Sequence, residues 1–170
     1  MEGRDLEADV AAAKRTIKLL QDRAQLVDFA LRLKRDYPEI GFMAYACLDK
    51  CIKNKLVNRN INRLPPPSTV DQERVDLELI WKRAVAACNI LSIATLSSVK
   101  KHGYRNAMLN QLRDVSSIGT GGFQRLLKFS FPEFSAEYVM RKYYPDFLSP
   151  EQITAIDTLL QSVGIEPPVP

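Results

Sequence analysis

Apolar residues recur at helical spacing along the first 35 positions of the chain. They follow steps of four and three, at Leu6, Val10, Ala13, Ile17, Leu20, Ala24, Val27 and Leu31. This spacing is typical of an apolar stripe along one face of a helix. An unbroken helix over residues 5–35 would be about 46 Å long, whereas a compact chain of this length is only about 40 Å across. We therefore expect either a break near residues 21–23 or a helix that projects from the domain.

The two halves of this stretch have different apolar faces. After residue 25 the face widens through Leu26, Phe29, Ala30 and Leu33, which favours burial inside a domain, whereas the first half offers a narrow stripe that suits one partner helix. We predict that residues 1–24 form a helical arm, which docks on a second copy or folds back as a hairpin. The alternative is an ordinary core helix. The residues predicted for oligomerisation are Leu6, Val10, Ala13, Ile17 and Leu20.

The rest of the chain also reads as helices separated by turn signals. Glycine, proline and asparagine mark the ends of elements, and no segment alternates between apolar and polar residues with a period of two. The predicted helices cover residues 38–56, 70–101, 104–115, 122–130 and 134–143, with a last one between Ser149 and Gly164. The sequence thus predicts an all-α protein, a compact bundle of about seven helices. Residues 25–164 form its single domain, and residues 165–170 are an extended proline-rich tail.

Composition indicates an intracellular globular protein without a membrane span. The apolar share of 46% and the charged share of 26% are ordinary for a folded domain. The three cysteines cannot all pair with one another, and no signal peptide is recognised before them, so we expect a cytoplasmic or nuclear location. The longest uncharged run, residues 84–99, is short and contains several polar residues, so it reads as a buried core helix.

Charge is unevenly distributed along the chain. The net charge is only +4, but both ends are acidic and the middle is basic. The stretch CIKNKLVNRNINRLPPPSTV, residues 51–70, contains no acid and follows Lys50. Cationic side chains with asparagines suit contacts to phosphates, although basic residues at a helix C-terminus also stabilise the helix dipole.

Motifs for catalysis or metal binding are weak. Cys47 and Cys51 lie four residues apart, but only Cys88 and the single His102 could complete a metal site. A cysteine nucleophile paired with His102 is not indicated, and we expect the cysteines to be buried as small apolar residues. The glycine-rich residues 119–122 lack the lysine and hydroxyl residue of a nucleotide-binding loop, so they favour a tight turn over an anion site.

Aromatic residues concentrate near the C-terminus, interleaved with cations. Most of the phenylalanines there are expected to pack the small helices, whereas Tyr143 and Tyr144, beside Arg141 and Lys142, are candidates for stacking on single-stranded bases. The predicted nucleic-acid-binding residues are Lys50, Lys53, Lys55, Arg59, Arg63, Lys100, Lys101, Arg105, Arg125, Lys128, Arg141, Lys142, Tyr143 and Tyr144. Those up to Arg63 are expected to line one wall of a groove, and Lys100, Lys101 and Arg105 the other.

These features favour a non-enzymatic assembly protein without metal or cofactor. The leading hypothesis is a nucleocapsid-like homo-oligomer that binds single-stranded RNA, or another polyanion, through a basic groove. The alternative is a helical adaptor, such as a viral or microbial effector, that binds and regulates a host protein through the arm or the tail.

Overall fold

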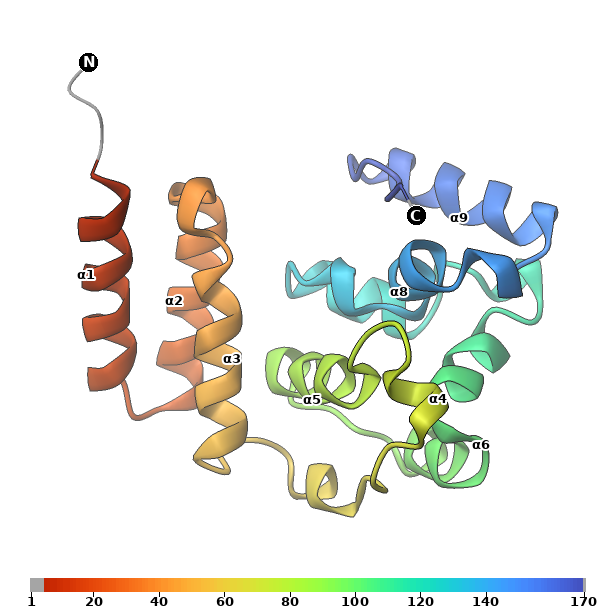
Figure 1. The fold of residues 1–170 in the computed structure, drawn as a ribbon, viewed down its shortest axis with the longest axis horizontal. Helices are drawn as coiled ribbons and strands as arrows, with labels where there is room; N and C mark the ends of the chain where they lie inside the picture. Colours follow the sequence, from red (N-terminus) through yellow and green to blue (C-terminus); the bar gives the residue numbers. More distant parts are fainter. Residues whose placement is uncertain (1–4, 170) are drawn as a thin grey trace. The chain divides into compact units, whose positions relative to one another are not determined.

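The protein is helical in every regular element that the structure describes. The computed structural model describes residues 5–169, and these contain nine α-helices, five short 3-10 helices and no strand (Figure 1). The predicted all-α class is therefore confirmed. The chain divides into two compact units, of which the first ends at Arg59 and the second begins at Asn60.

Unit 1 is built on α3 (Met43–Lys53), against which α1 (Leu6–Leu19) and α2 (Arg23–Asp36) both pack. The short 3-10 helix η1 (Pro38–Ile40) joins α2 to α3, with Pro38 in its first turn. The core of the unit is formed by fully buried side chains on α2 and α3, namely Leu26, Ala30, Ala44, Cys47, Leu48 and Cys51. The wide apolar face predicted for the second half of the N-terminal stretch is thus an interior face.

The break between α1 and α2 lies where the chain-length argument predicted it. Leu20 leaves α1 in an extended conformation, and Asp22 caps α2 by accepting a hydrogen bond from the Gln25 amide at 3.2 Å. An aspartate at this position satisfies one of the free amides of the first helical turn. The predicted boundary between residues 24 and 25 therefore lies inside unit 1, next to the start of α2.

The stripe predicted to contact a second copy is partly used inside unit 1. Ala13 is 4% exposed and Ile17 is 8% exposed, whereas Leu6 is exposed and Val10 and Leu20 are half-buried. Because α1 packs on α3, Ala13 and Ile17 are not available to a partner in this conformation. For Ala13 and Ile17, at the centre of the stripe, the prediction of an oligomerisation surface is therefore corrected, because both residues are buried within unit 1. Residues 1–4 of the predicted arm lie outside the described residues.

Unit 2 contains the remaining helices, connected by short turns. After η2 (Arg59–Arg63), which starts at the last residue of unit 1, they are α4 (Thr69–Gln72), α5 (Leu77–Cys88), α6 (Ile93–Gln111), η3 (Val115–Ser117), α7 (Gly122–Lys128), η4 (Pro132–Phe134), α8 (Ala136–Tyr143), η5 (Pro145–Phe147) and α9 (Pro150–Ser162). The last of them begins with the expected capping box, in which Ser149 and Gln152 each accept from the other's backbone amide.

The predicted helix over residues 70–101 is wrong. It is divided among α4, α5 and α6, because Asp76 caps α5, Asn89 adopts a left-handed conformation with φ of 55° at its end, and Ser92 caps α6. Each cap is a side chain that accepts a hydrogen bond from a backbone amide. The Leu79 amide donates to Asp76 at 2.9 Å, and the Thr95 amide donates to Ser92 at 3.1 Å. The apolar periodicity continues across both breaks, which hides them from a pattern of spacing alone.

Gly103 bends α6 around a buried carboxylate. Its φ of 78° and ψ of 171° interrupt the helix at the predicted position, although helical residues continue to Gln111 on the far side. The Asp71 carboxylate lies here, 3% exposed, and accepts hydrogen bonds from the Ser68 amide, the Ser68 hydroxyl and the Arg105 amide. A side chain at position 103 would place its Cβ 3.2 Å from this carboxylate. The bend therefore requires glycine.

Two further expectations concern the membrane and the tail. Within residues 5–169, no helix has the length and apolar character needed to cross a membrane. Residues 165–169 follow α9 without regular structure, as predicted for the tail, and Pro170 lies outside the described residues.

Candidate nucleic-acid interface

Three exposed cations lie at the end of α3 and in the segment that follows it. Lys53 is the last residue of α3, Lys55 follows its C-cap, and Arg59 begins η2. All three are exposed, and none of their side chains makes a hydrogen bond or ion pair with any described residue. We call these three residues the basic segment. The chain carries no acidic residue between Asp49 and Asp71, so no neighbour in the sequence neutralises them.

Lys55 occupies a backbone position that favours glycine. Its φ is 56°, in the left-handed region. The Leu56 amide donates to the Cys51 carbonyl at 2.9 Å and the Lys55 amide donates to the Ile52 carbonyl at 3.1 Å, the two bonds of a Schellman motif. An L-residue in this conformation costs about 1–2 kcal/mol because its Cβ crowds the following carbonyl.

The end of α9 shows the same motif with the favoured residue. There the Ile165 amide donates to the Leu160 carbonyl at 2.9 Å, and the left-handed position is held by Gly164 with φ of 76°. Lys55 and Gly164 thus occupy equivalent positions in equivalent turns. Lysine at the first of these positions lowers stability, and its side chain makes no hydrogen bond or ion pair with a described residue.

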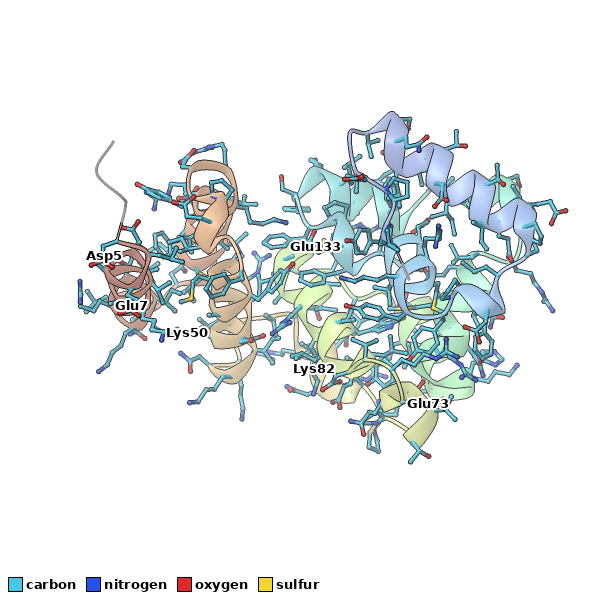
Figure 2. All side chains as sticks on the ribbon, turned by 45° about the horizontal axis from the view of Figure 1, so that its top comes forward. Asp5, Glu7, Lys50, Glu73, Lys82 and Glu133 are labelled. Carbon is cyan, nitrogen blue, oxygen red and sulfur yellow. The ribbon has the colours of Figure 1, made fainter. Side chains whose placement is uncertain are left out.

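Lys50 has a structural role, which corrects its predicted place in the interface. Its side chain extends from α3, where Figure 2 labels it. Its ammonium group donates hydrogen bonds to the carbonyls of Ile17 at 2.8 Å, Lys18 at 2.9 Å and Leu20, all at the end of α1. These carbonyls lack partners within the helix, and a cation complements the negative end of the helix dipole. All three donors of the ammonium are used, so Lys50 holds α1 against α3.

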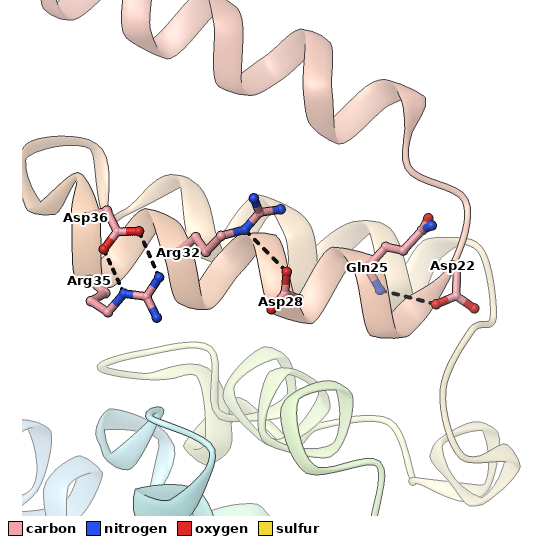
Figure 3. A network of polar contacts seen from close by, with 6 residues as sticks. All are labelled: Asp22, Gln25, Asp28, Arg32, Arg35 and Asp36. Atoms are coloured by element: carbon pink, nitrogen blue, oxygen red, sulfur yellow. Dashed lines mark hydrogen bonds and ion pairs between the residues drawn. The ribbon is translucent and has the colours of Figure 1, made fainter.

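Several other cations of unit 1 are neutralised by acids close in sequence. On α2, Arg32 pairs with Asp28 at 3.3 Å and Arg35 with Asp36 at 2.7 Å (Figure 3). These pairs are exposed and contribute little to stability, but they reduce the net positive potential of α2. The basic segment has no such pairing.

The predicted residues of unit 2 fall into exposed and packed groups. Lys100, Lys101, Arg125 and Lys128 are exposed and make no hydrogen bond or ion pair with described residues. Arg63 is also exposed and donates only a long hydrogen bond of 3.4 Å to the Asn60 side chain. These five cations remain available to an anionic ligand. Of the first predicted wall, Lys50, Lys53, Lys55 and Arg59 belong to unit 1, whereas Arg63 belongs to unit 2 together with the second wall.

Arg105 and Tyr144 pack together with a residue that the sequence did not single out, Arg74. The Arg74 guanidinium pairs with Asp146, with one contact at 2.8 Å, and also binds the Tyr143 carbonyl at 2.9 Å. It lies 5.1 Å from the centre of the Tyr144 ring, while Arg105 lies 4.4 Å from that of Phe147. Hydrogen bonding to Arg74 lowers the pKa of Asp146, so this ion pair persists well below neutral pH.

Tyr144 is therefore corrected as a base-stacking candidate. Its side chain is 0% exposed, and its ring is covered on the Arg74 side. Burial also raises the pKa of its hydroxyl. A ring without an accessible face cannot stack on a base, so the role of Tyr144 is to pack the end of α8.

Arg141 and Lys142 also have partners within unit 2. Arg141 is half-buried and forms a two-point ion pair with Asp157 on α9, with Nε to Oδ1 at 2.8 Å. Lys142 lies 5.3 Å from the centre of the half-buried Tyr143 ring. Arg141 thus connects α8 to α9, which corrects its assignment as a phosphate ligand, while Lys142 and Tyr143 keep partial exposure.

The glycine-rich loop binds a carboxylate of its own chain. The Gly119 amide donates to Glu137 Oε1 at 3.0 Å, and Glu137 is only 5% exposed. Burial raises the pKa of this carboxyl group, an effect that the Gly119 hydrogen bond partly offsets. The loop is thus a tight turn, as expected, and its amide at Gly119 is not free for a phosphate.

All three cysteines are buried and unpaired by disulfides. Burial raises the pKa of Cys47 to about 12 and that of Cys51 to about 11, so both thiols stay protonated at neutral pH. Cys88 is buried and His102 is exposed. Among the described residues, no group of three or more histidine, cysteine, aspartate or glutamate side chains could hold a metal ion.

Comparison of the chain with protein-family models, with curated proteins and with solved structures finds no match. The function of the chain is therefore inferred from its own residues.

Proposed function

We propose that the chain is a non-enzymatic nucleic-acid-binding protein that holds single-stranded RNA through its phosphates. The basic segment, in unit 1, provides the proposed contacts, and unit 2 carries exposed cations of its own at Arg63, Lys100, Lys101, Arg125 and Lys128. Phosphate contacts of this kind supply most of the affinity in sequence-independent binding, because they release condensed counterions.

The observation that carries this proposal is the lysine in a left-handed turn. Residues that hold an unfavourable backbone conformation without a compensating contact concentrate at functional positions. Glycine at position 55 would remove the strain, as Gly164 does in the equivalent turn of α9. The presence of a cation in place of glycine suggests that position 55 serves a ligand that requires positive charge.

The chemistry of the neighbouring residues supports a polyanion over an acidic protein surface. Lys53, Lys55 and Arg59 are separated by one and three residues, and Asn54 lies between the first two. Asparagine amides donate hydrogen bonds to phosphate oxygens as well as to base edges. A strand with a phosphate at each nucleotide can satisfy such a row, whereas the compact carboxylate patches of proteins pair with individual arginines in a two-point geometry.

Assembly along the strand is the more specific form of this proposal. A nucleocapsid-like protein needs contacts between copies, and Ala13 and Ile17 are buried within unit 1. Exposed apolar residues that flank them, such as Leu6 and Leu19, remain candidates for this contact. Because α1 packs on α3, a disruptive change at Ile17 is expected to destabilise unit 1 rather than to remove a partner selectively.

The test is the salt dependence of RNA binding. Three phosphate contacts to a single strand predict a log–log slope of affinity against salt of about −2, and all the exposed cations together predict a steeper one. Titration of labelled single-stranded RNA at several salt concentrations measures this slope. Absence of binding at low salt, with the protein folded, would refute the proposal and favour the protein-binding adaptor.

A further inference from the structure

A cavity of about 400 Å³, open to solvent, lies in unit 2 between α5, α6 and α7 and the start of α8. This volume falls within the range of about 300–1,000 Å³ that is usual for small-molecule sites. Its walls are mostly apolar, and Trp81, Met108 and Phe134 supply its largest apolar side chains. Large apolar side chains around a cavity of this size suit a flat aromatic ligand.

Polar groups line the same cavity without a partner among residues 5–169. The side chains of Asn110 and Gln111 line it, are exposed, and make no hydrogen bond with any described residue. The indole nitrogen of Trp81 is buried and also lacks a hydrogen-bond partner in the described part of the chain. Amide side chains offer both donors and acceptors, which is the combination that reads the edges of nucleobases.

Arg125 adds a positive charge at this cavity. Its guanidinium is exposed, it has no hydrogen bond or ion pair with a described residue, and no acidic side chain is among the described residues that line the cavity. An arginine with free donors next to an apolar cavity favours a ligand that combines a ring with an anionic group, because the fork of guanidinium donors matches phosphate oxygens.

We propose that this cavity binds one nucleotide unit, with the base among the apolar side chains, the Asn110 and Gln111 amides at its edge and the phosphate at Arg125. The nucleotide comes either from a bound RNA strand, whose base leaves the stack to enter the cavity, or from a free nucleoside monophosphate. Insertion of a base from a bound RNA strand rests on the proposed RNA binding. Binding of a free nucleoside monophosphate in the cavity does not depend on that proposal.

Trp81 makes the test direct, because it is the only tryptophan of the chain and it lines the cavity. Its fluorescence is measured during titration with the four nucleoside monophosphates, with ribose 5-phosphate and with octanoate, an anion that has an apolar chain but no ring. We expect saturable changes with the nucleotides and none with ribose 5-phosphate. Changes with octanoate but with no nucleotide would overturn the proposal.

Two variants connect any signal to the cavity. Arg125→Gln removes the charge at an exposed position and should weaken nucleoside monophosphate binding about tenfold. Ala94→Phe adds a ring at an exposed position that lines the cavity and should abolish the signal, while circular dichroism reports that the variant remains folded. Nucleotide binding that is unchanged in both variants would place the ligand elsewhere and refute the proposal.

Comparison of two oligonucleotides separates the sources of the nucleotide. An RNA 12-mer and an abasic strand of the same length present similar phosphates, but only the first can fill the cavity. A change in Trp81 fluorescence with the RNA and not with the abasic strand supports insertion of a base from a strand. If the RNA binds to the basic segment and neither the strands nor the mononucleotides alter Trp81, the cavity proposal fails and the proposed function stands.

Discussion

Replacing Lys55 by glycine tests whether this residue lowers stability in return for a ligand contact. Lys55 holds the left-handed position of the Schellman motif that ends α3, with φ of 56°. Glycine removes the crowding between Cβ and the following carbonyl, and the two hydrogen bonds of the motif are unaffected because they use backbone atoms alone. The variant should therefore be more stable and bind RNA less tightly.

The magnitude follows from two opposing effects. Removing a left-handed L-residue relieves about 1–2 kcal/mol. The greater freedom of glycine in the unfolded chain offsets about 0.5–1 kcal/mol of this gain. Lys55→Gly should thus increase the free energy of unfolding of unit 1 by about 0.5–1 kcal/mol. Lys55→Ala, which removes the same charge but keeps Cβ, should leave it nearly unchanged.

Hydrogen exchange gives the assay, because the two units need not unfold together and a single unfolding midpoint would mix them. Mass spectrometry of peptides from α3 reports protection in unit 1, and RNA affinity is measured on the same samples. Both variants should lower the salt slope of RNA binding by about 0.7, the contribution of one contact to a single strand. Equal stability of the glycine and alanine variants would refute the argument from backbone strain. Unchanged RNA binding in both would exclude Lys55 from the interface.

Three further predictions concern residues with structural roles. Lys50→Met should lower the free energy of opening of α1, measured by hydrogen exchange, by about 2 kcal/mol, because a charge-assisted cap on three carbonyls is lost. Lys53→Met, at an exposed position on the same helix, should change this free energy little. Equal effects of the two variants would contradict the capping role of Lys50. The pKa of Glu137 is higher in the folded chain than its ordinary value of 4.5 in the unfolded chain. Between these two pKa values the native state binds more protons than the unfolded state, so the free energy of unfolding falls as pH rises. Glu137→Gln should remove this fall in urea titrations from pH 4 to 7, and an unchanged pH profile would contradict it. Gly103→Ala should destabilise unit 2 by about 1–3 kcal/mol, because the backbone conformation at this position is accessible essentially only to glycine. Unfolding followed by the fluorescence of Trp81 measures this change. No loss of stability would show that the bend can relax.

Much of the helical framework was predictable from local signals. From helix length and domain size we expect either a break near residues 21–23 or a projecting helix, and the structure has the break, between Leu19 and Arg23. Capping signals placed the start of α9 at Ser149 correctly. The same kind of signal was present at Asp76 and Ser92, where both side chains cap helices, but the uninterrupted apolar pattern outweighed it and produced a helix that is too long.

The roles of individual cations depended on contacts that sequence spacing does not contain. Lys50 and the carbonyl of Ile17 are 33 positions apart, and Arg74 and Asp146 are 72 apart. A basic side chain that caps a distant helix has the same local sequence as one that binds phosphate. The sequence therefore indicates which stretch of the chain carries the candidate interface. That Lys50 caps a helix whereas Lys53 is exposed follows only from the packing of α1 on α3.

The measurement that tests the central claim most directly is RNA binding by the basic segment with a charge-matched control. Fluorescence anisotropy with labelled single-stranded RNA, at two salt concentrations, compares the unmodified protein with K53A/K55A/R59A and with K14A/R15A/K18A, which removes three exposed cations from α1. We expect the first variant to lose about 2 units of the log–log salt slope and the control to retain most of it. Equal losses in the two variants, or unchanged binding in the first, would contradict the claim that the basic segment holds the strand.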